Sequence, residues 1–364
     1  MASIRIPADR VRAQITAILE SWGIPADIRD ITAEVMVATD LSGVDSHGIS
    51  MLMDYDRSRS LGKINVAARP RVVRETPVTA LMDADAGMGH PASVMGMELA
   101  IAKAKKTGLA AVSVYNSHHF GAAGYYAAMA PKHGLVGMVT SATRTIAVVP
   151  TRAAIPMLGT NPFAFAAPAG HNHDFLLDMA TSTVASNKVK VYDLHNKKLP
   201  PGWVMDADGT VVEDSATGFD IIYNRDQGGL TPLGGIEAMS SYKGYGLGLM
   251  VHILGGGLSG APFSPIRNRT QKPNDPDRLG HFFLAMDPAA FRQDGGFVDD
   301  MDAVIDELHN TPPANPARPV LVPGDPEAAT RAERLRDGIP LPETLLAKLR
   351  AVCEGCGAPY ILEG

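Results

Sequence analysis

The segment Ala110-Ala-Val-Ser-Val-Tyr115 continues into Asn116-Ser-His-His-Phe-Gly-Ala-Ala-Gly-Tyr125, and this stretch indicates the fold more strongly than any other. Its first part is apolar and β-branched, which predicts a buried strand, and residues 122–132 predict a helix. Open α/β sheets bind ligands at the carboxyl ends of their strands, so the adjacent His118 and His119 lie where a site is expected. Because imidazole exchanges protons near neutral pH, we interpret this loop as part of an active site; the alternative is a purely structural histidine.

A second motif, Asp45-Ser46-His47-Gly48, follows a helical segment at residues 28–42. A carboxylate, a hydroxyl and an imidazole within three positions can orient a histidine as a general acid or base. The alternative is an ordinary helix C-terminus, with Gly48 as terminator and His47 favoured by the helix dipole.

The composition is that of an ordinary globular protein, with 45% hydrophobic and 20% charged residues and a net charge of −6. We find no basic stripe, which disfavours nucleic acid as a partner, and no apolar stretch long enough to span a bilayer. The N-terminus lacks the apolar core of a signal peptide. Cys353 and Cys356 are interpreted as reduced thiols, and no acidic or histidine cluster has the spacing of metal ligands. We therefore expect a cytoplasmic protein without a metal site.

The chain mixes helices and strands without regular alternation. Helices are predicted at residues 11–22, 28–42, 92–106, 241–258, 326–337 and 342–353. Strands are predicted within 70–83 and at 110–115, 135–141, 163–167, 175–178, 280–286 and 319–322, and residues 192–235 are expected to be irregular. This order predicts an α/β protein with a mixed sheet and one domain inserted within another.

Two glycine-rich segments match the letters of a dinucleotide-binding fingerprint, at residues 87–92 and 255–260. The first has no acidic residue at the end of the next strand, and the second ends a helix, so neither predicts a Rossmann domain. Lys243 begins a glycine-rich helix, where an ammonium group and backbone N–H groups can receive a phosphate.

Several motifs occur in order along the chain: Asp45-Ser-His-Gly48, Asn116-Ser-His-His-Phe-Gly121, Gly159-Thr-Asn-Pro162, Asp178-Met-Ala-Thr-Ser182, Lys243-Gly-Tyr-Gly-Leu247 and Pro323-Gly-Asp325. Together they resemble the malate/L-lactate dehydrogenase family of the sulfolactate dehydrogenase type. This family is unrelated to the Rossmann-fold lactate and malate dehydrogenases. It includes ureidoglycolate dehydrogenase, diketogulonate reductase and a reductase of cyclic imino acids.

The resemblance implies a non-Rossmann, mixed-sheet α/β fold of the sulfolactate/malate dehydrogenase type. Within it, residues 121–289 would form an inserted cofactor-binding domain, and residues 1–120 with 290–364 a discontinuous substrate and dimerisation domain. The resemblance also implies a homodimer that transfers a hydride between NAD or NADP and a small-molecule substrate of the 2-oxo acid or 2-hydroxy acid type.

The resemblance further implies roles for individual residues. His47 and His119 are the expected acid/base residues, and Ser46 is expected to support His47. Met51 and Thr160 are expected to contact the substrate. The expected cofactor-binding residues are Ala123, Thr143, Gly159, Thr160, Asn161, Asp178, Met179, Ala180, Lys243, Gly244, Arg278, Gly324 and Asp325.

The chain departs from the family pattern at three places. Met51 stands where the family usually has an arginine, Asn187-Lys188 replaces a Gly-Lys pair, and residues 148–155 lack a Gly-Gly turn. Since Met51 offers no charge to a substrate carboxylate, we expect poor reduction of small 2-oxo acids unless another cation substitutes. Arg57, Arg59 and Arg144 are the candidates in the sequence.

The sequence leaves three alternative functions open. A reductase of cyclic imines would use similar protein chemistry, so the sequence does not separate it from a 2-oxo acid reductase. A hydrolase would use Ser46 or Ser117 with a neighbouring histidine, although neither serine lies in a nucleophile-elbow pattern. A non-catalytic protein would bind the nicotinamide without turnover.

Overall fold

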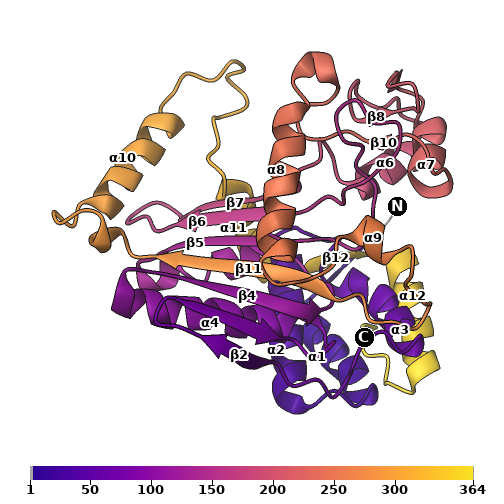
Figure 1. Ribbon diagram of the computed structural model, residues 1–364, viewed down its shortest axis with the longest axis horizontal. Helices are drawn as coiled ribbons and strands as arrows, with labels where there is room; N and C mark the ends of the chain where they lie inside the picture. Colours follow the sequence, from indigo (N-terminus) through magenta and orange to yellow (C-terminus); the bar gives the residue numbers. More distant parts are fainter. Residues whose placement is uncertain (1–2, 364) are drawn as a thin grey trace.

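The computed structural model describes residues 3–363, and its centre is a mixed seven-stranded sheet (Figure 1). The strands, in their order across the sheet, are β2 (Arg71–Glu75), β3 (Thr79–Asp83), β4 (Leu109–Ser117), β11 (Leu279–Met286), β5 (Val136–Ser141), β6 (Phe163–Ala167) and β7 (Phe175–Met179). β3 and β4 pair in parallel, and the other neighbours pair antiparallel. The predicted mixed-sheet fold is confirmed.

Strand β11 lies in the middle of this sheet although it comes late in the chain. It pairs with β4 on one side and β5 on the other, so that Phe283 lies opposite both Val112 and Val139. The fully buried Phe283 ring packs against Gly96, where a Cβ would come within 2.9 Å of the ring. At the other end of β11, Leu279 lies opposite Ser117, so the segment before β11 meets the histidine loop that follows β4.

Helices cover both faces of the sheet. In Figure 1, α1 (Ala8–Ser21), α2 (Ala26–Leu41) and α4 (Gly89–Thr107) lie below it, and α8 (Tyr242–His252) lies above it. Further helices are α3 (Leu52–Ser60), α5 (Ala123–Ala127), α6 (Ser186–Leu194), α7 (Ser215–Asn224), α9 (Ser264–Arg267), α10 (Phe297–His309), α11 (Asp325–Asp337) and α12 (Glu343–Cys356). The short strands β1 (Ser3–Ile6) and β12 (Ile339–Pro342) join the two ends of the chain in an antiparallel pair.

A small lobe lies above the sheet, at the upper right of Figure 1. It contains α6, α7 and the three-stranded sheet of β8 (Val204–Met205), β9 (Val211–Val212) and β10 (Gly229–Leu230). The expectation that residues 192–235 are irregular is therefore wrong. Helix α7 begins after Asp214, whose side chain accepts a hydrogen bond from the backbone N–H of Thr217. This N-cap was the available sequence signal.

Two other expectations need correction. Residues 319–322 form no strand in the described chain; the contact with the sheet edge is a hydrogen bond from Leu176 N–H to the carbonyl of Pro323 (3.0 Å). Prolines at 319 and 323 lack the N–H group that a ladder needs. The helix predicted over residues 122–132 ends early, because the chain turns before Pro131 into a separate short 3-10 helix.

The proposed division at residues 121 and 289 stays a prediction. The central sheet crosses this division, since β4 belongs to one part and β11 to the other. Across residues 3–363, none of the helices combines the length and the apolar character that a membrane span requires.

Gly89 begins α4 directly beneath the histidine loop. Its N–H donates to the carbonyl of His119 (3.1 Å), and a Cβ at this position would come within 2.4 Å of the carbonyl oxygen of His118 and 2.7 Å of Phe120 Cβ. Gly89, the second glycine of the 87–92 segment, is therefore needed for close packing of α4 against the histidine loop.

We expect Gly89→Ala to lower the free energy of unfolding by about 1–3 kcal/mol, because the added methyl group overpacks a rigid backbone contact. Gly246→Ala is the matched control, since a Cβ at this position of α8 has no atom within 4 Å. The control should be neutral or slightly stabilising. Urea denaturation of both variants tests this, and wild-type stability for Gly89→Ala would contradict it.

The Asp45-Ser46-His47-Gly48 loop is anchored on Asp40, which is buried near the end of α2. Asp40 Oδ2 accepts from the N–H of Ile49 (2.8 Å), and a Cβ on Gly48 would come within 1.9 Å of Asp40 Oδ1. Gly48 is thus required for close approach. Burial raises the pKa of Asp40 to about 8, although the hydrogen bond from Ile49 opposes this shift.

This pKa gives a stability prediction with a defined sign. The folded protein keeps the proton on Asp40 up to about pH 8, whereas the unfolded chain releases it near 3.8, so this residue destabilises the fold as pH rises between those values. Asp40→Asn retains an acceptor for Ile49 but does not ionise. The free energy of unfolding of Asp40→Asn minus that of wild type should therefore be larger at pH 8 than at pH 5, which means that the variant gains stability over wild type as pH rises. An equal difference at both pH values would exclude the effect.

Candidate active site

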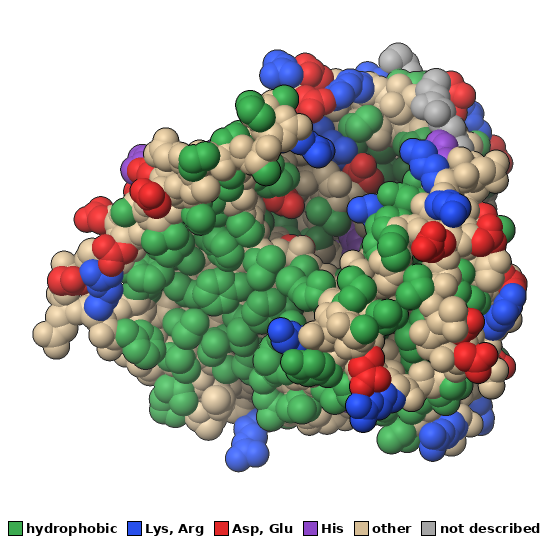
Figure 2. All heavy atoms as spheres, turned by 90° about the horizontal axis from the view of Figure 1, so that it is seen from above, with side chains coloured by type: hydrophobic (Ala, Val, Ile, Leu, Met, Phe, Trp, Pro, Cys, Tyr) green, Lys and Arg blue, Asp and Glu red, His purple; other side chains and the backbone are tan. Residues whose placement is uncertain are grey.

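One cavity of about 960 Å³ brings most of the expected site residues together. Figure 2, viewed from above, shows the molecule hollowed, with a histidine side chain visible at the bottom of the hollow. The expected residues in the cavity wall are Ser46, His47, Met51, His119, Ala123, Thr143, Thr160, Asp178, Met179, Ala180 and Gly324. These residues come from distant segments of the chain, and the sheet and α5 bring them together.

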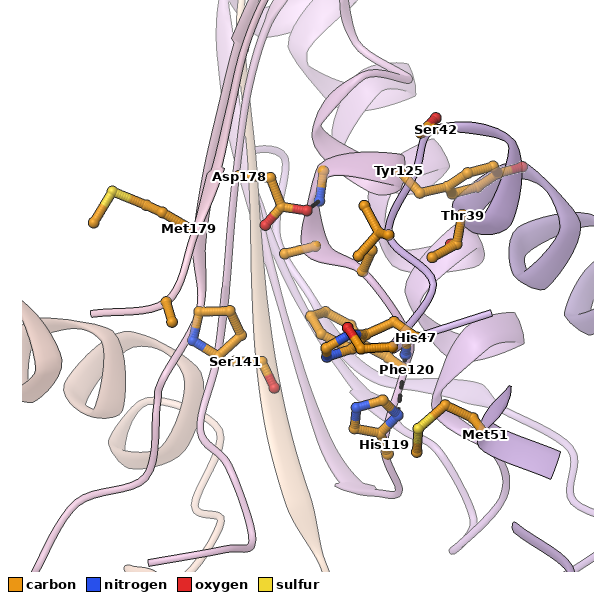
Figure 3. A pocket seen from close by; sticks show the side chains of 18 of the residues that line it. Thr39, Ser42, His47, Met51, His119, Phe120, Tyr125, Ser141, Asp178 and Met179 are labelled. Carbon is orange, nitrogen blue, oxygen red and sulfur yellow. Dashed lines mark hydrogen bonds between the residues drawn. The ribbon is translucent and has the colours of Figure 1, made fainter. Parts of the chain in front are cut away.

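The two histidine motifs meet at one end of this cavity. The rings of His47 and His119 stack with centroids 5.4 Å apart and an angle of 29° between their planes. Figure 3 shows both side chains with Phe120 and Met51 close by. The site therefore has two imidazoles within reach of one small ligand.

The hydrogen bonds of His119 fix the position of its proton. The backbone N–H of Gly121 donates to Nδ1 (3.3 Å), so Nδ1 is an acceptor. The hydroxyl of the fully buried Tyr55 lies 2.8 Å from the same nitrogen. A neutral imidazole with an acceptor Nδ1 carries its proton on Nε2. Burial, together with the neighbouring histidines, lowers the pKa of His119 well below its usual value, so the ring is uncharged at neutral pH.

The hydrogen-bond partner of His47 does not fix which ring nitrogen carries the proton. Its Nδ1 lies 2.7 Å from Ser46 Oγ, and a hydroxyl can either donate or accept there. Burial lowers the pKa of His47. The Ser46 hydroxyl is thus compatible with a proton on either nitrogen of His47, whereas Gly121 is not compatible with a proton on Nδ1 of His119.

A charged cluster that the sequence analysis did not find lies beside these histidines. Asp277 Oδ2 lies 3.1 Å from His118 Nε2 and 3.3 Å from Arg144 Nη1, and Oδ1 lies 3.4 Å from Lys63 Nζ. Burial would raise the pKa of Asp277, but His118, Arg144 and Lys63 outweigh it and hold the pKa below the usual range. Of the three arginines considered as substitutes for a charge at position 51, Arg144 lines the cavity, whereas Arg57 and Arg59 do not.

Below the loop, His281 on β11 holds both neighbouring strands. Its Nε2 lies 2.9 Å from Ser117 Oγ and its Nδ1 lies 2.8 Å from Ser141 Oγ. The His281 ring also stacks on Phe120 at 4.5 Å. Ser117 is buried and paired with this structural histidine, so it does not face the imidazole pair as a nucleophile would.

Asp178 lies farther along the cavity wall, at the end of β7. Its Oδ2 accepts from the N–H of Gly124 (2.7 Å), an interaction drawn as a dashed line in Figure 3. Desolvation within the cavity and, to a smaller extent, the charge of Glu327 raise the pKa of Asp178 to about 6, while the Gly124 bond opposes the shift. Two carboxyl groups therefore face this part of the cavity.

Six expected cofactor residues lie outside the cavity wall: Gly159, Asn161, Lys243, Gly244, Arg278 and Asp325. Gly159 and Asn161 support Thr143, since a Cβ at Gly159 would clash with Thr143 and Asn161 accepts from its hydroxyl (3.0 Å). Lys243 is exposed at the start of α8. The roles of these residues in cofactor binding stay predictions.

Sequence comparison agrees with the motifs. The chain matches the family model of malate/L-lactate dehydrogenases over residues 6–350. The malate dehydrogenase of Pyrococcus horikoshii is 37% identical over 356 residues, which cover 97% of this chain and 96% of that protein. The L-sulfolactate dehydrogenase of Methanocaldococcus jannaschii is 34% identical over 343 residues, with 94% of each chain covered.

Solved structures give the same relationship. The malate dehydrogenase of Entamoeba histolytica superposes with a TM-score of 0.91 at 30% identity, covering 98% of this chain and 99% of that one. The delta1-piperideine-2-carboxylate reductase of Pseudomonas syringae superposes with a TM-score of 0.81 at 27% identity, covering 96% and 99%. The chain therefore belongs to the malate/L-lactate dehydrogenase family, and it is an oxidoreductase of the hydroxy acid dehydrogenase type.

Proposed function

We propose that this protein transfers a hydride between NADH or NADPH and the 2-carbon of a 2-oxo acid, in the cavity that contains the stacked imidazoles. The stacked pair carries the proposal, because reduction of a carbonyl needs a proton at oxygen as well as a hydride at carbon. Membership of a dehydrogenase family argues against the alternatives of a serine hydrolase and a non-catalytic binding protein.

The cavity suits a nicotinamide dinucleotide. Its volume of about 960 Å³ is at the upper end of the range for small-molecule sites. The second oxygen of Asp178 and the carboxylate of Glu327 are acceptors for ribose hydroxyls, and Lys132 and Arg331 in the same wall are cations for phosphates. When bound, the nicotinamide supplies or accepts the hydride. Either NAD or NADP satisfies these contacts.

The two imidazoles have different roles in this proposal. His119 keeps its proton on Nε2 and donates a hydrogen bond to the substrate oxygen, where negative charge develops as the hydride arrives. His47 exchanges the proton, because Ser46 can accept from or donate to Nδ1 as the protonation of Nε2 changes. Ser46 thereby supports His47.

A cyclic imine is the second candidate substrate. The structural similarity to delta1-piperideine-2-carboxylate reductase favours it, since that protein shares the fold over nearly the whole chain. Protonation at nitrogen would replace protonation at oxygen, and the same imidazoles would serve. Comparison of rates on a cyclic imino acid and on its open-chain oxo acid counterpart distinguishes the two.

The homodimer that the family resemblance implies stays a prediction. Its support is a broad apolar area on the face shown in Figure 2 and a group of exposed apolar side chains on and after α8, among them Leu247, Met250, Ile253 and Leu258.

The proposed function predicts loss of absorbance at 340 nm when reduced nicotinamide is mixed with protein and a suitable 2-oxo acid or cyclic imine. A panel of both substrate classes with NADH and with NADPH is the test. The His47→Gln variant is the control for activity from contaminating enzymes. Absence of turnover with every pair would refute the proposed function.

Replacement of the two imidazoles by glutamine should lower kcat to different extents. His47→Gln should lower kcat by about 10²–10⁴-fold, because an amide does not exchange a proton. His119→Gln should cost only about tenfold, because the amide N–H still donates a hydrogen bond. Equal losses in both variants would contradict the division of roles.

The pH dependence checks the same assignment. Reduction needs protonated His47, and burial lowers the pKa of this ring below its ordinary value, so the reduction rate should rise as pH falls toward that pKa. Oxidation needs the neutral ring and should decline over the same range. Both changes should persist in His119→Gln and disappear in His47→Gln.

A further inference from the structure

A cluster with an excess of positive charge lies beside the cavity at the end that contains the histidines. The buried carboxylate of Asp277 lies against Lys63 and Arg144, and the side chain of Arg267 donates to the backbone carbonyls of Asp277 (2.6 Å) and Arg144 (3.3 Å). Lys63, Arg144 and Arg267 thus lie around a single carboxyl group, and the cluster contains two more basic than acidic side chains. A site of this kind attracts an anion.

Arg144 is the member of this cluster that can reach a ligand. Its side chain is 43% exposed and lines the cavity, whereas the side chain of Asp277 is 1% exposed and that of Lys63 is 14% exposed. A guanidinium has five N–H donors, and the contact with Asp277 engages Nη1. The remaining donors suit a carboxylate, which guanidinium binds in a bidentate manner.

The part of the cavity wall around Met51 lacks such a group. Helix α3 and the turn before it contribute Met51 and Asp54 to the cavity, an uncharged thioether and a carboxylate. Neither attracts an anion, so a carboxylate of the substrate is directed to the Arg144 side.

The other two cations in the cavity wall serve a different part of it. Arg331 lies near Tyr125, because its charge, like those of Glu34 and Arg12, contributes to the pKa of the Tyr125 hydroxyl. Glu327 lies near Asp178, because its charge contributes to the pKa of the Asp178 carboxyl group. Lys132, just beyond α5, is the third cation of the wall. Arg144 is linked to the histidine end through His118 and Asp277.

We propose that Arg144, held in place by Asp277 and Arg267, binds the carboxylate of the substrate and substitutes for the charge that Met51 lacks. This inference rests on the proposed function, because it names the group that recognises the substrate of the same site. The substrate is accordingly an anionic oxo acid or imino acid, with its carboxylate on Arg144 and its reacting atom beside His47 and His119.

The test compares the best 2-oxo acid of the panel with its neutral methyl ester. Arg144→Gln should lower kcat/KM for the acid by about 10- to 150-fold, mainly through KM, because a charged hydrogen bond is lost. The value for the ester should change little. An unchanged ratio of acid to ester would overturn the proposal.

Two further variants make the comparison sharper. Met51→Arg added to Arg144→Gln should restore part of the preference for the acid, since it places a guanidinium in the same cavity. Arg152→Gln is the matched control; its side chain is 79% exposed and pairs with Glu237 outside the cavity. Arg152→Gln should leave the ratio at the wild-type value, and a loss as large as that of Arg144→Gln would count against the assignment.

Binding of oxalate, measured by calorimetry, separates this inference from the proposed function. Wild type should bind oxalate, and Arg144→Gln should bind it at least tenfold more weakly, even if no substrate of the panel is turned over. Failure of turnover with retained Arg144-dependent oxalate binding would refute the reaction alone. Equal binding to both proteins, or none to wild type, would refute the carboxylate site.

Discussion

The antiparallel pairing of β11 between β4 and β5 is the constraint on which the site depends. It joins residues 279–286 to two strands that precede them by more than a hundred positions. This pairing brings Asp277 into contact with His118, and it places His281 beside the end of β4, from which the histidine loop begins. The loop after β4 then has a fixed floor, because His281 contacts both Ser117 and Ser141. Asp40 and Gly48 fix the loop that carries His47. The stacked imidazoles are held between these two supports.

Burial of several imidazoles in one region explains much of the local chemistry. Burial lowers the pKa of His47, His90, His119 and His281, and mutual repulsion among the rings adds to this effect for His90, His119 and His281. Uncharged rings have one donor and one acceptor nitrogen, so each partner selects a tautomer. Gly121 selects the acceptor Nδ1 of His119, while the hydroxyl of Ser46 leaves His47 free to change. In the proposed function, the two roles differ because His119 Nδ1 has a backbone N–H partner in addition to the Tyr55 hydroxyl, whereas His47 Nδ1 has only the hydroxyl of Ser46 among its hydrogen bonds described above.

Local patterns were sufficient to predict the main elements and the two histidine motifs. The apolar run at 110–115 lies within β4, and residues 92–106 lie within α4. Both could be predicted because a hydrophobic pattern over about ten residues indicates the type of element. Tyr55, Asp277 and Lys63 were not predicted, since their roles come from contacts across the fold: Tyr55 reaches His119 from α3, and Asp277 and Lys63 are 214 positions apart. Helix α7 was missed although Asp214 is a recognisable N-cap. The start of a glycine-rich helix suggested that Lys243 binds a cofactor phosphate, and this stays a prediction; Lys243 is exposed in the first turn of α8.

The tautomer of His119 is the most direct test of this account. Nitrogen-15 NMR of protein labelled at histidine, with His119 assigned by its loss in His119→Gln, reports which ring nitrogen carries the proton. We predict that His119 is uncharged at neutral pH, with its proton on Nε2 and an unprotonated Nδ1 that accepts a hydrogen bond. A proton on Nδ1 at neutral pH, or a charged His119 ring, would contradict the assignment of His119 as the fixed donor to the substrate oxygen.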